Sequence, residues 1–436
     1  RKVTSFNLVR LQGLGYSRAF LQILEKFPNF GELSFSAQYK ILSQERSVYS
    51  SGFADGMSRL GNQAVEIFFD CEDAQKTWAA EQGVDYSNKY WQVEIVLAQL
   101  QKMKPDVLFF QDIYALPEKV RRRIKDYVPS VRVVVIQKGY PGETGDLSDA
   151  DILLVSSPIL YERYREQSPH LLYHSFDADI PLSLMERESI ERERLVFAGS
   201  SRAPEDRYWM LRQLLRETPI NIWVDENHNS HKKHGGWLNH WAWKRYIRAK
   251  LVNEMRLNSD GLPVKLFSMV SALPKVERIL AEAQGRGCAN LKDRELPGLR
   301  RGLLSKRTLS EEFPSRSKPS LFGLDYYELL SRSDVVFNIH SAKSQDTVDN
   351  MKMFETTGMG ACLLTDTGRN MKDLFEEDVE IVTYRSADEA IEKAKYLIEN
   401  PEKAREIAVA GRAKTLARHT MFHRCEEIDE IIRTHL

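Results

Sequence analysis

The amino-acid sequence predicts an α/β protein made of two domains, each with a parallel sheet covered by helices. Short apolar runs alternate with helical segments through residues 1–178, as in sheets with right-handed crossover connections. A segment rich in Glu and Arg follows at 179–192, which we interpret as a linker. The alternation then restarts at residue 193, and a length of 436 residues suits two such domains.

The strands expected in the first domain are apolar runs rich in Val, Ile, Leu and Phe, which is typical of strands buried on both faces. They lie at residues 2–9, 64–70, 105–112, 131–137, 150–157 and 171–176. Helical spacing is found between them, at residues 18–27, 39–60, 89–103, 117–128 and 157–167. Segment 39–60 is expected to form one helix, because Tyr49 and Phe53 stand four apart and Gly61 follows.

The second domain, residues 193–414, repeats this pattern. Its expected strands lie at residues 194–201, 220–226, 335–339, 361–365 and 380–384, and its expected helices at 206–218, 323–333, 348–358, 387–399 and 402–419. Residues 227–320 interrupt the alternation, so we expect a helical insertion there. The last segment, 415–436, has an amphipathic pattern.

Composition limits the classes of partner. Lys plus Arg equals Asp plus Glu, 62 each, so a global field for nucleic acid is not expected. The four cysteines, Cys71, Cys288, Cys362 and Cys425, are far apart and form no CxxC, which indicates neither a zinc site nor a disulfide framework and fits a reducing compartment. The apolar runs are too short to cross a bilayer, and we therefore expect a cytoplasmic protein.

The most informative stretch is residues 335–366, which reads as strand, polar loop, short helix and second strand. Asp346 or Thr347 is expected to cap the helix, and Gly358 and Gly360 to end it. The loop opens at the carboxyl end of a strand, where open parallel sheets bind ligands. The helix N-terminus offers N–H groups and partial positive charge, which suit a phosphate.

The string NxKxFExxGxGxxLLTD in this stretch resembles GT-B glycosyltransferases of the glycosyl-transferase-group-1-like family, which includes spore-maturation-type glycosyltransferases. The resemblance continues through residues 380–424 and is weaker at 75–83 and 104–112. It implies two Rossmann-like domains across a cleft, acceptor side first and donor side second, with residues 415–436 crossing back to the first domain. It also implies transfer of a sugar from a nucleotide-diphosphate sugar to a glycan or related hydroxyl acceptor, in bacterial surface polysaccharide or glycoconjugate synthesis.

On the donor side, the resemblance implies that Glu355 holds ribose hydroxyls, since a carboxylate accepts two hydrogen bonds at once. The alternative is an ion pair with Lys352 on the same helix. Lys352 could instead reach the diphosphate as a point charge, or remain a solvated helix residue. Asn350 could offer amide donors to a phosphate or only support the helix start. His340, in the preceding loop, is a catalytic candidate that contacts sugar or phosphate, or else a structural histidine.

A second phosphate loop is expected in FAGSSRAPEDR. Gly199 allows close backbone approach, and Ser200, Ser201 and Arg202 supply donors. The position matches the glycine-containing loop that GT-B enzymes place beside the donor. Arg207 is a further candidate cation.

On the acceptor side, Asp112 follows a strand and is the best single candidate for a catalytic base. Its alternative role is to cap the helix that begins near Pro117. Residues 137–140 follow another strand and could approach an acceptor. His419 and Arg424 match a family pattern in the last helix, and we expect them to lock that helix to the domain.

Several questions stay open at this level. Retaining relatives carry a second glutamate eight positions before Glu355, where this chain has Thr347, so the resemblance does not decide between retention and inversion. It implies no bound metal, and the histidines at 228–240 lack a cysteine partner or an HExxH motif. Residues 237–256 mix Trp with Arg and Lys. This segment could lie on the inner face of a membrane near a lipid-linked acceptor, stack on an acceptor sugar or partner, or form a plain packed helix.

Two other functions remain compatible with the sequence. One is a nucleotide-sugar epimerase of the same architecture, and the other is a non-catalytic protein that binds sugar nucleotides or acts as a scaffold. Turnover of the donor separates the scaffold from both enzymes. A modified acceptor separates transfer from epimerisation.

Overall fold

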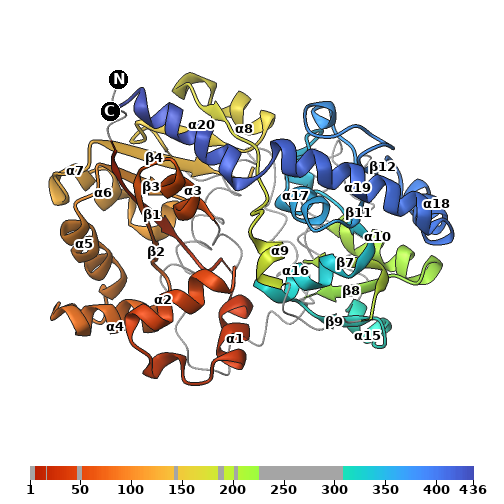
Figure 1. Ribbon diagram of the computed structural model, residues 1–436, viewed down its shortest axis with the longest axis horizontal. Helices are drawn as coiled ribbons and strands as arrows, with labels where there is room; N and C mark the ends of the chain where they lie inside the picture. The colour runs from red at the N-terminus through yellow and green to blue at the C-terminus, as the bar shows by residue number, and fades with distance from the viewer. Residues whose placement is uncertain are drawn as a thin grey trace, which may run out of the picture.

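The computed structural model describes residues 5–15, 17–46, 52–141, 146–184, 191–200, 205–224 and 308–436. In these residues the chain forms two α/β domains side by side, each built on a six-stranded sheet (Figure 1). All the strand pairs within both sheets are parallel. The expected α/β fold with two parallel sheets is confirmed.

The first sheet has the strand order β2-β1-β3-β4-β5-β6. Its strands are β1 (Asn7–Gln12), β2 (Gln63–Phe68), β3 (Val107–Phe110), β4 (Val133–Lys138), β5 (Ile152–Val155) and β6 (His170–Leu171). Its helices are α1 (Ser17–Lys26), α2 (Phe35–Gln44), α3 (Phe53–Arg59), α4 (Glu72–Gln82), α5 (Trp91–Met103), α6 (Glu118–Arg121), α7 (Ile124–Tyr127) and α8 (Pro158–Arg163). Alternate residues of β1 and β3 enter two separate apolar clusters, so both faces of this sheet are buried.

The second sheet has the order β12-β11-β10-β7-β8-β9. Its strands are β7 (Glu193–Gly199), β8 (Asn221–Val224), β9 (Ser317–Pro319), β10 (Ser333–Asn338), β11 (Cys362–Asp366) and β12 (Val382–Tyr384). The helices of this half are α9 (Ile180–Leu184), α10 (Glu205–Glu217), α15 (Leu309–Glu312), α16 (Gly323–Ser331), α17 (Met351–Gly358), α18 (Ala387–Glu399), α19 (Pro401–Arg418) and α20 (Met421–Arg433). Of the expected insertion at 227–320, residues 308–320 are described, and they supply α15 and the edge strand β9. The rest of it lies outside the described residues, including segment 237–256 and the histidines at 228–240.

Two of the helices expected in the first domain are divided in the structure. Segment 39–60 is not one helix: α2 ends at Gln44, and α3 begins after Gly52, whose N–H donates to the Asp177 carboxylate at 3.0 Å. A tertiary contact with Asp177, at the end of the first domain, thus overrides the local helical spacing. Segment 117–128 is likewise divided into α6 and α7.

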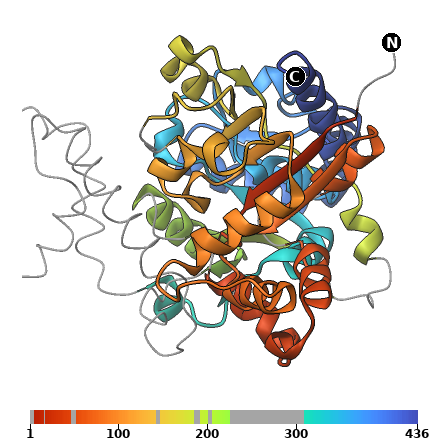
Figure 2. The ribbon, with the colours of Figure 1, turned by 90° about the vertical axis from the view of Figure 1, so that its left-hand side faces the viewer.

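The last helix, α20, crosses back to the first domain as expected, and in Figure 2 it lies, dark blue, beside the red first strand. The crossing is fixed to the end of the first domain, because Phe176 N–H donates to His419 O and Met421 N–H donates to Phe176 O, both at 2.8 Å. Arg424 donates to Tyr173 O at 2.8 Å and to the His419 ring at 3.0 Å. His419 and Arg424 therefore lock the helix in place. Burial and the charge of Arg424 lower the pKa of His419 to about 4.

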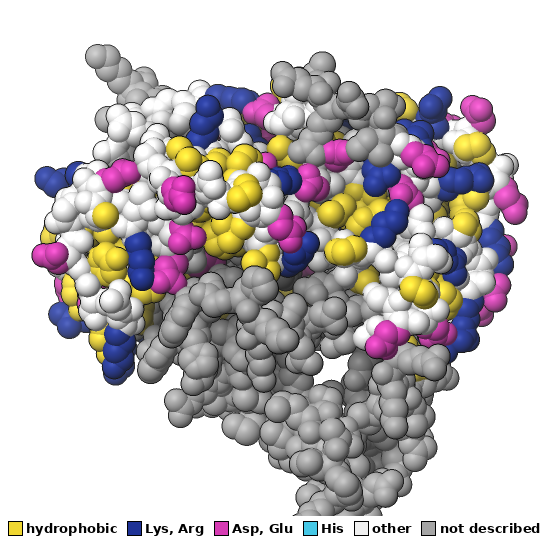
Figure 3. Space-filling view, turned by 90° about the horizontal axis from the view of Figure 1, so that it is seen from below, with side chains coloured by type: hydrophobic (Ala, Val, Ile, Leu, Met, Phe, Trp, Pro, Cys, Tyr) yellow, Lys and Arg dark blue, Asp and Glu magenta, His cyan; other side chains and the backbone are white. Residues whose placement is uncertain are grey.

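On the coloured part of the face in Figure 3, basic and acidic side chains are interspersed rather than grouped by sign. This agrees with the equal numbers of acidic and basic residues in the sequence. Among the described residues, every helix is too short or too polar to span a bilayer.

Candidate functional site

A pocket between the two domains marks where strand ends of the first sheet approach the start of α17. The first domain contributes Gln111, which follows β3, and Gln137 of β4. The second contributes Tyr327 of α16 and Met351, the first residue of α17. Ligands of parallel sheets bind at the carboxyl ends of the strands, and clefts between domains are favoured for small molecules. We therefore place the candidate site around this pocket.

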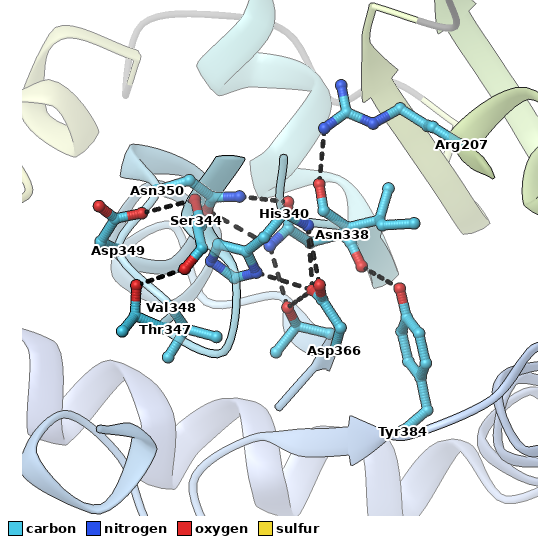
Figure 4. Close-up of polar contacts among 12 residues, drawn as sticks. Arg207, Asn338, His340, Ser344, Thr347, Val348, Asp349, Asn350, Asp366 and Tyr384 are labelled. Carbon is cyan, nitrogen blue, oxygen red and sulfur yellow. Dashed lines mark hydrogen bonds and ion pairs between the residues drawn. The ribbon is translucent and has the colours of Figure 1, made fainter. Parts of the chain in front are cut away.

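His340 follows β10 and is held against Asp366, the last residue of β11 (Figure 4). The His340 backbone N–H donates to both carboxylate oxygens of Asp366, at 3.0 and 3.1 Å, and the ring Nδ1 lies 2.7 Å from one of them. Burial acts to raise the pKa of the Asp366 carboxyl, but the charge and hydrogen bonds of His340 outweigh it, and the pKa is lowered. Nδ1 is the ring nitrogen that faces the carboxylate, and the buried Nε2 has no hydrogen-bond partner among the described residues.

Asn350 is the N-cap residue of α17, in place of the expected Asp346 or Thr347, which were wrong. Its side chain does not cap the helix. Instead its amide exchanges hydrogen bonds with the amide of Asn338 on β10, at 3.0 and 3.3 Å (Figure 4). The Asn350 side chain thus accepts no hydrogen bond from the first-turn N–H groups of α17, which suits an anion at this end.

Lys352 does not extend into solvent. Its ammonium donates to Ala198 O and lies 4.9 Å above the Phe197 ring, both on β7. Gly199 makes this placement feasible, because a Cβ there would overlap the Lys352 Nζ. Burial and the nearby charge of Arg207 lower the pKa of Lys352 to about 7, so the ammonium loses its proton far more easily than an ordinary lysine does.

Glu355 lies one turn further along α17 and is only 7% exposed. Its two carboxylate oxygens accept hydrogen bonds from Tyr326 at 3.1 Å and Tyr327 at 3.2 Å, both on α16. Burial raises the pKa of Glu355, and Lys352 and the two tyrosine hydroxyls oppose that rise. The sequence did not indicate the tyrosines, because nothing in the run GLDYYELL separates them from ordinary core residues.

The loop after β7 is joined to the end of β10 by Arg207 of α10. Its guanidinium donates to Ser200 O at 3.1 Å. It also donates to Ile339 O at 2.8 Å, the bond drawn from Arg207 in Figure 4. Arg207 therefore places positive charge at the carboxyl edge of the second sheet, beside Lys352. Ser201 and Arg202, two of the expected phosphate donors, lie outside the described residues.

The first domain brings two carboxyl groups together where its strands end. Asp112 caps the short 3-10 helix Ile113–Ala115 by accepting from Tyr114 N–H at 2.8 Å. Asp70, after β2, accepts from Leu14 N–H at 2.9 and 3.1 Å. Burial and the charge of Asp112 raise the pKa of Asp70 to about 7, despite the Leu14 hydrogen bond. Sequence analysis missed Asp70, although it ends an apolar strand just as Asp112 does.

Solved structures with the same architecture define the class of fold. HepE of Anabaena in complex with UDP-glucose is similar over 98% of this chain and 100% of its own, with 12% identity and a TM-score of 0.51. A glycosyltransferase from Rickettsia africae ESF-5 is similar over 99% of both chains, with 8% identity and a TM-score of 0.50. This chain therefore has the GT-B fold.

The family comparison agrees with the fold. Residues 277–430 match the family described as Glycosyl transferase-like. The matched region includes β10, α17, β11 and the residues Lys352, Glu355 and Asp366. Residues 277–430 are thus similar in sequence to this family, within a chain that has the GT-B fold. No curated protein sequence matches the chain.

Proposed function

We propose that this chain is a glycosyltransferase that moves a sugar from a nucleotide-diphosphate sugar to a hydroxyl of a glycan or lipid-linked acceptor. The observation that carries the proposal is the pair Lys352 and Glu355, a buried ammonium and a buried carboxylate one turn apart on α17. The carboxylate suits the two hydroxyls of a ribose. The ammonium and the helix N-terminus suit a diphosphate. Buried ionisable groups with shifted pKa values concentrate at functional sites.

In the transfer step, negative charge grows on the leaving diphosphate. We expect Lys352, Arg207 beside it and the first-turn N–H groups of α17 to stabilise this charge. An anion beside Lys352 favours the charged ammonium, so its pKa rises when the diphosphate binds. We propose that this local positive charge serves in place of a bound metal ion.

The acceptor hydroxyl must lose its proton, and Asp70 is our choice for the base. Its pKa of about 7 allows it to accept a proton near neutrality. Asp112 supports that role through its charge, because a second carboxylate disfavours ionisation of the first. His340, whose buried Nε2 has no hydrogen-bond partner among the described residues, is the alternative base on the donor side.

The similar HepE structure contains UDP-glucose, so UDP is the first nucleotide to test. We place the reaction in the cytoplasm and in the synthesis of bacterial surface polysaccharides or glycoconjugates. The expected acceptor is accordingly a growing glycan.

The test is calorimetric titration of the folded chain with the diphosphates of uridine, guanosine, adenosine, cytidine and thymidine. Glu355→Ala should lose the response to the preferred nucleotide. The control Glu392→Ala, on the exposed face of α18, should keep it. Nucleotide release from the matching sugar donor, followed with candidate acceptors, then distinguishes transfer from donor binding alone. Failure of the folded wild-type chain to bind any of the five nucleotides would refute the proposal.

A further inference from the structure

Both oxygens of the Glu355 carboxylate already accept a hydroxyl hydrogen bond, one from Tyr326 and one from Tyr327. Each carboxylate oxygen has two lone pairs. A tyrosine and a ribose hydroxyl can therefore bind the same oxygen together. The tyrosines fix the plane of the carboxylate and leave one acceptor position on each oxygen.

The two tyrosines are themselves held by a contact between domains. They lie on α16, and the backbone N–H of Leu324, near its start, donates to Glu45 O of the first domain at 3.0 Å. The next residue, Asp325, accepts from Gln22 at 2.7 Å and pairs with Lys26 at 2.8 Å, both on α1. The element that orients Glu355 is thus anchored on the acceptor domain.

We propose that Tyr326 and Tyr327 are positioning residues for the nucleotide donor, holding the Glu355 carboxylate oriented to receive the ribose hydroxyls. This inference rests on the proposed function. The tyrosines act through Glu355 and make their own contribution only while that carboxylate is present.

Loss of the hydroxyl of either tyrosine should change the pKa of Glu355. Burial raises the pKa of Glu355, and both tyrosine hydrogen bonds lower it. A Tyr→Phe change therefore raises that pKa further, and the carboxylate becomes protonated at a higher pH than in the wild type.

Other charged groups also surround this cluster. Lys352 lies on α17 itself and Arg207 beside it on α10, and Asp177 and Arg46 lie near Tyr327. Tyr→Phe substitutions leave all four in place.

The experiment measures UDP affinity of the full chain by calorimetry from pH 5 to pH 8. The variants are Tyr326→Phe, Tyr327→Phe and the double variant. Tyr39→Phe is the control, since this ring packs on Phe35 and Phe68 in the first domain. The titration of UDP itself is common to all variants and cancels in the comparison.

We expect each Phe variant to bind UDP about tenfold more weakly at pH 6, since hydrogen bonds to charged groups are strong. The pH at which half the affinity is lost should also move upward. Unchanged or tighter binding, or weaker binding without that pH shift, would overturn the inference. Tyr326 is only half-buried, so its variant keeps the test valid if Tyr327→Phe fails to fold. If wild type binds no nucleotide, the proposed function fails instead, so the two failures are distinguishable.

Discussion

Replacing Lys352 by methionine should stabilise the protein at neutral pH, and this gain should shrink as the pH rises. The unfolded chain binds a proton on this lysine up to its ordinary pKa of 10.5, whereas the folded chain releases it near pH 7. Below pH 7 both states are charged, and the full burial penalty destabilises the fold. Between these two values the unfolded state holds more protons, so the stability of the wild type rises with pH.

The magnitude follows from the same values. One pKa unit corresponds to about 1.36 kcal/mol, so the difference between wild type and variant should change by about that amount per pH unit between pH 7 and pH 10. The variant also loses the hydrogen bond from Lys352 to Ala198 O. This loss shifts its free energy of unfolding at every pH and leaves the dependence on pH unchanged. Glu355 also makes the stability gain of the variant shrink as the pH rises. It loses the nearby charge of Lys352 in the variant, so its pKa rises further.

The assay is urea unfolding of both proteins at one-unit intervals from pH 6 to pH 10. Lys395→Met is the control, since Lys395 forms an exposed pair with Glu217 at 3.2 Å and surface pairs contribute little. A difference between wild type and Lys352→Met that stays constant over this range would refute the reasoning. It would mean that the ammonium of Lys352 is not buried as described.

The remaining predictions concern single contacts. Gly199→Ala should displace the flexible end of Lys352 and strain the backbone, whose φ is +154° there, and calorimetry on the folded variant should show UDP binding about tenfold weaker. Gly323→Ala should lower the melting temperature, because φ is +58° there and a Cβ would overlap Glu45 O; we expect a loss of at least about 1–2 kcal/mol. Asp70→Asn should reduce kcat about a hundredfold with UDP affinity unchanged and should remove the rate dependence near pH 7, and an unaltered pH–rate profile would count against the base role. UDP binding at pH 7.5 should take up protons through Lys352, so the measured binding enthalpy should vary with the ionisation enthalpy of the buffer.

The sequence predicted the second domain most accurately where local and global signals coincide. In residues 335–366 each apolar run became a strand, and the helix ended at Gly358. The helix start was missed because Asn350 bonds to Asn338 on a neighbouring strand, a partner that no local pattern reveals. The break within 39–60 has the same cause, a contact with distant Asp177.

Contacts with distant residues also limited what the sequence could predict about the site. Sequence spacing placed Lys352 and Glu355 on one helix and offered an ion pair between them as the alternative to ligand binding. In the structure Lys352 bonds to β7 and Glu355 to α16, so each has a partner from a different element. Asp70 and Asp112 are likewise brought together only by the strand order β2-β1-β3.

The arrangement around α17 is poorly explained by stability alone. A lysine whose pKa is lowered to about 7 and a glutamate whose pKa is raised both indicate buried charge, and buried charges are weak evidence for stability. A hydrophobic residue at either position would pack without that penalty. A bound diphosphate would favour the charged form of Lys352, and ribose hydroxyls would favour the charged form of Glu355. The burial of Lys352 and Glu355 is thus compensated by a ligand that carries both a diphosphate and ribose hydroxyls. A nucleotide diphosphate is such a ligand.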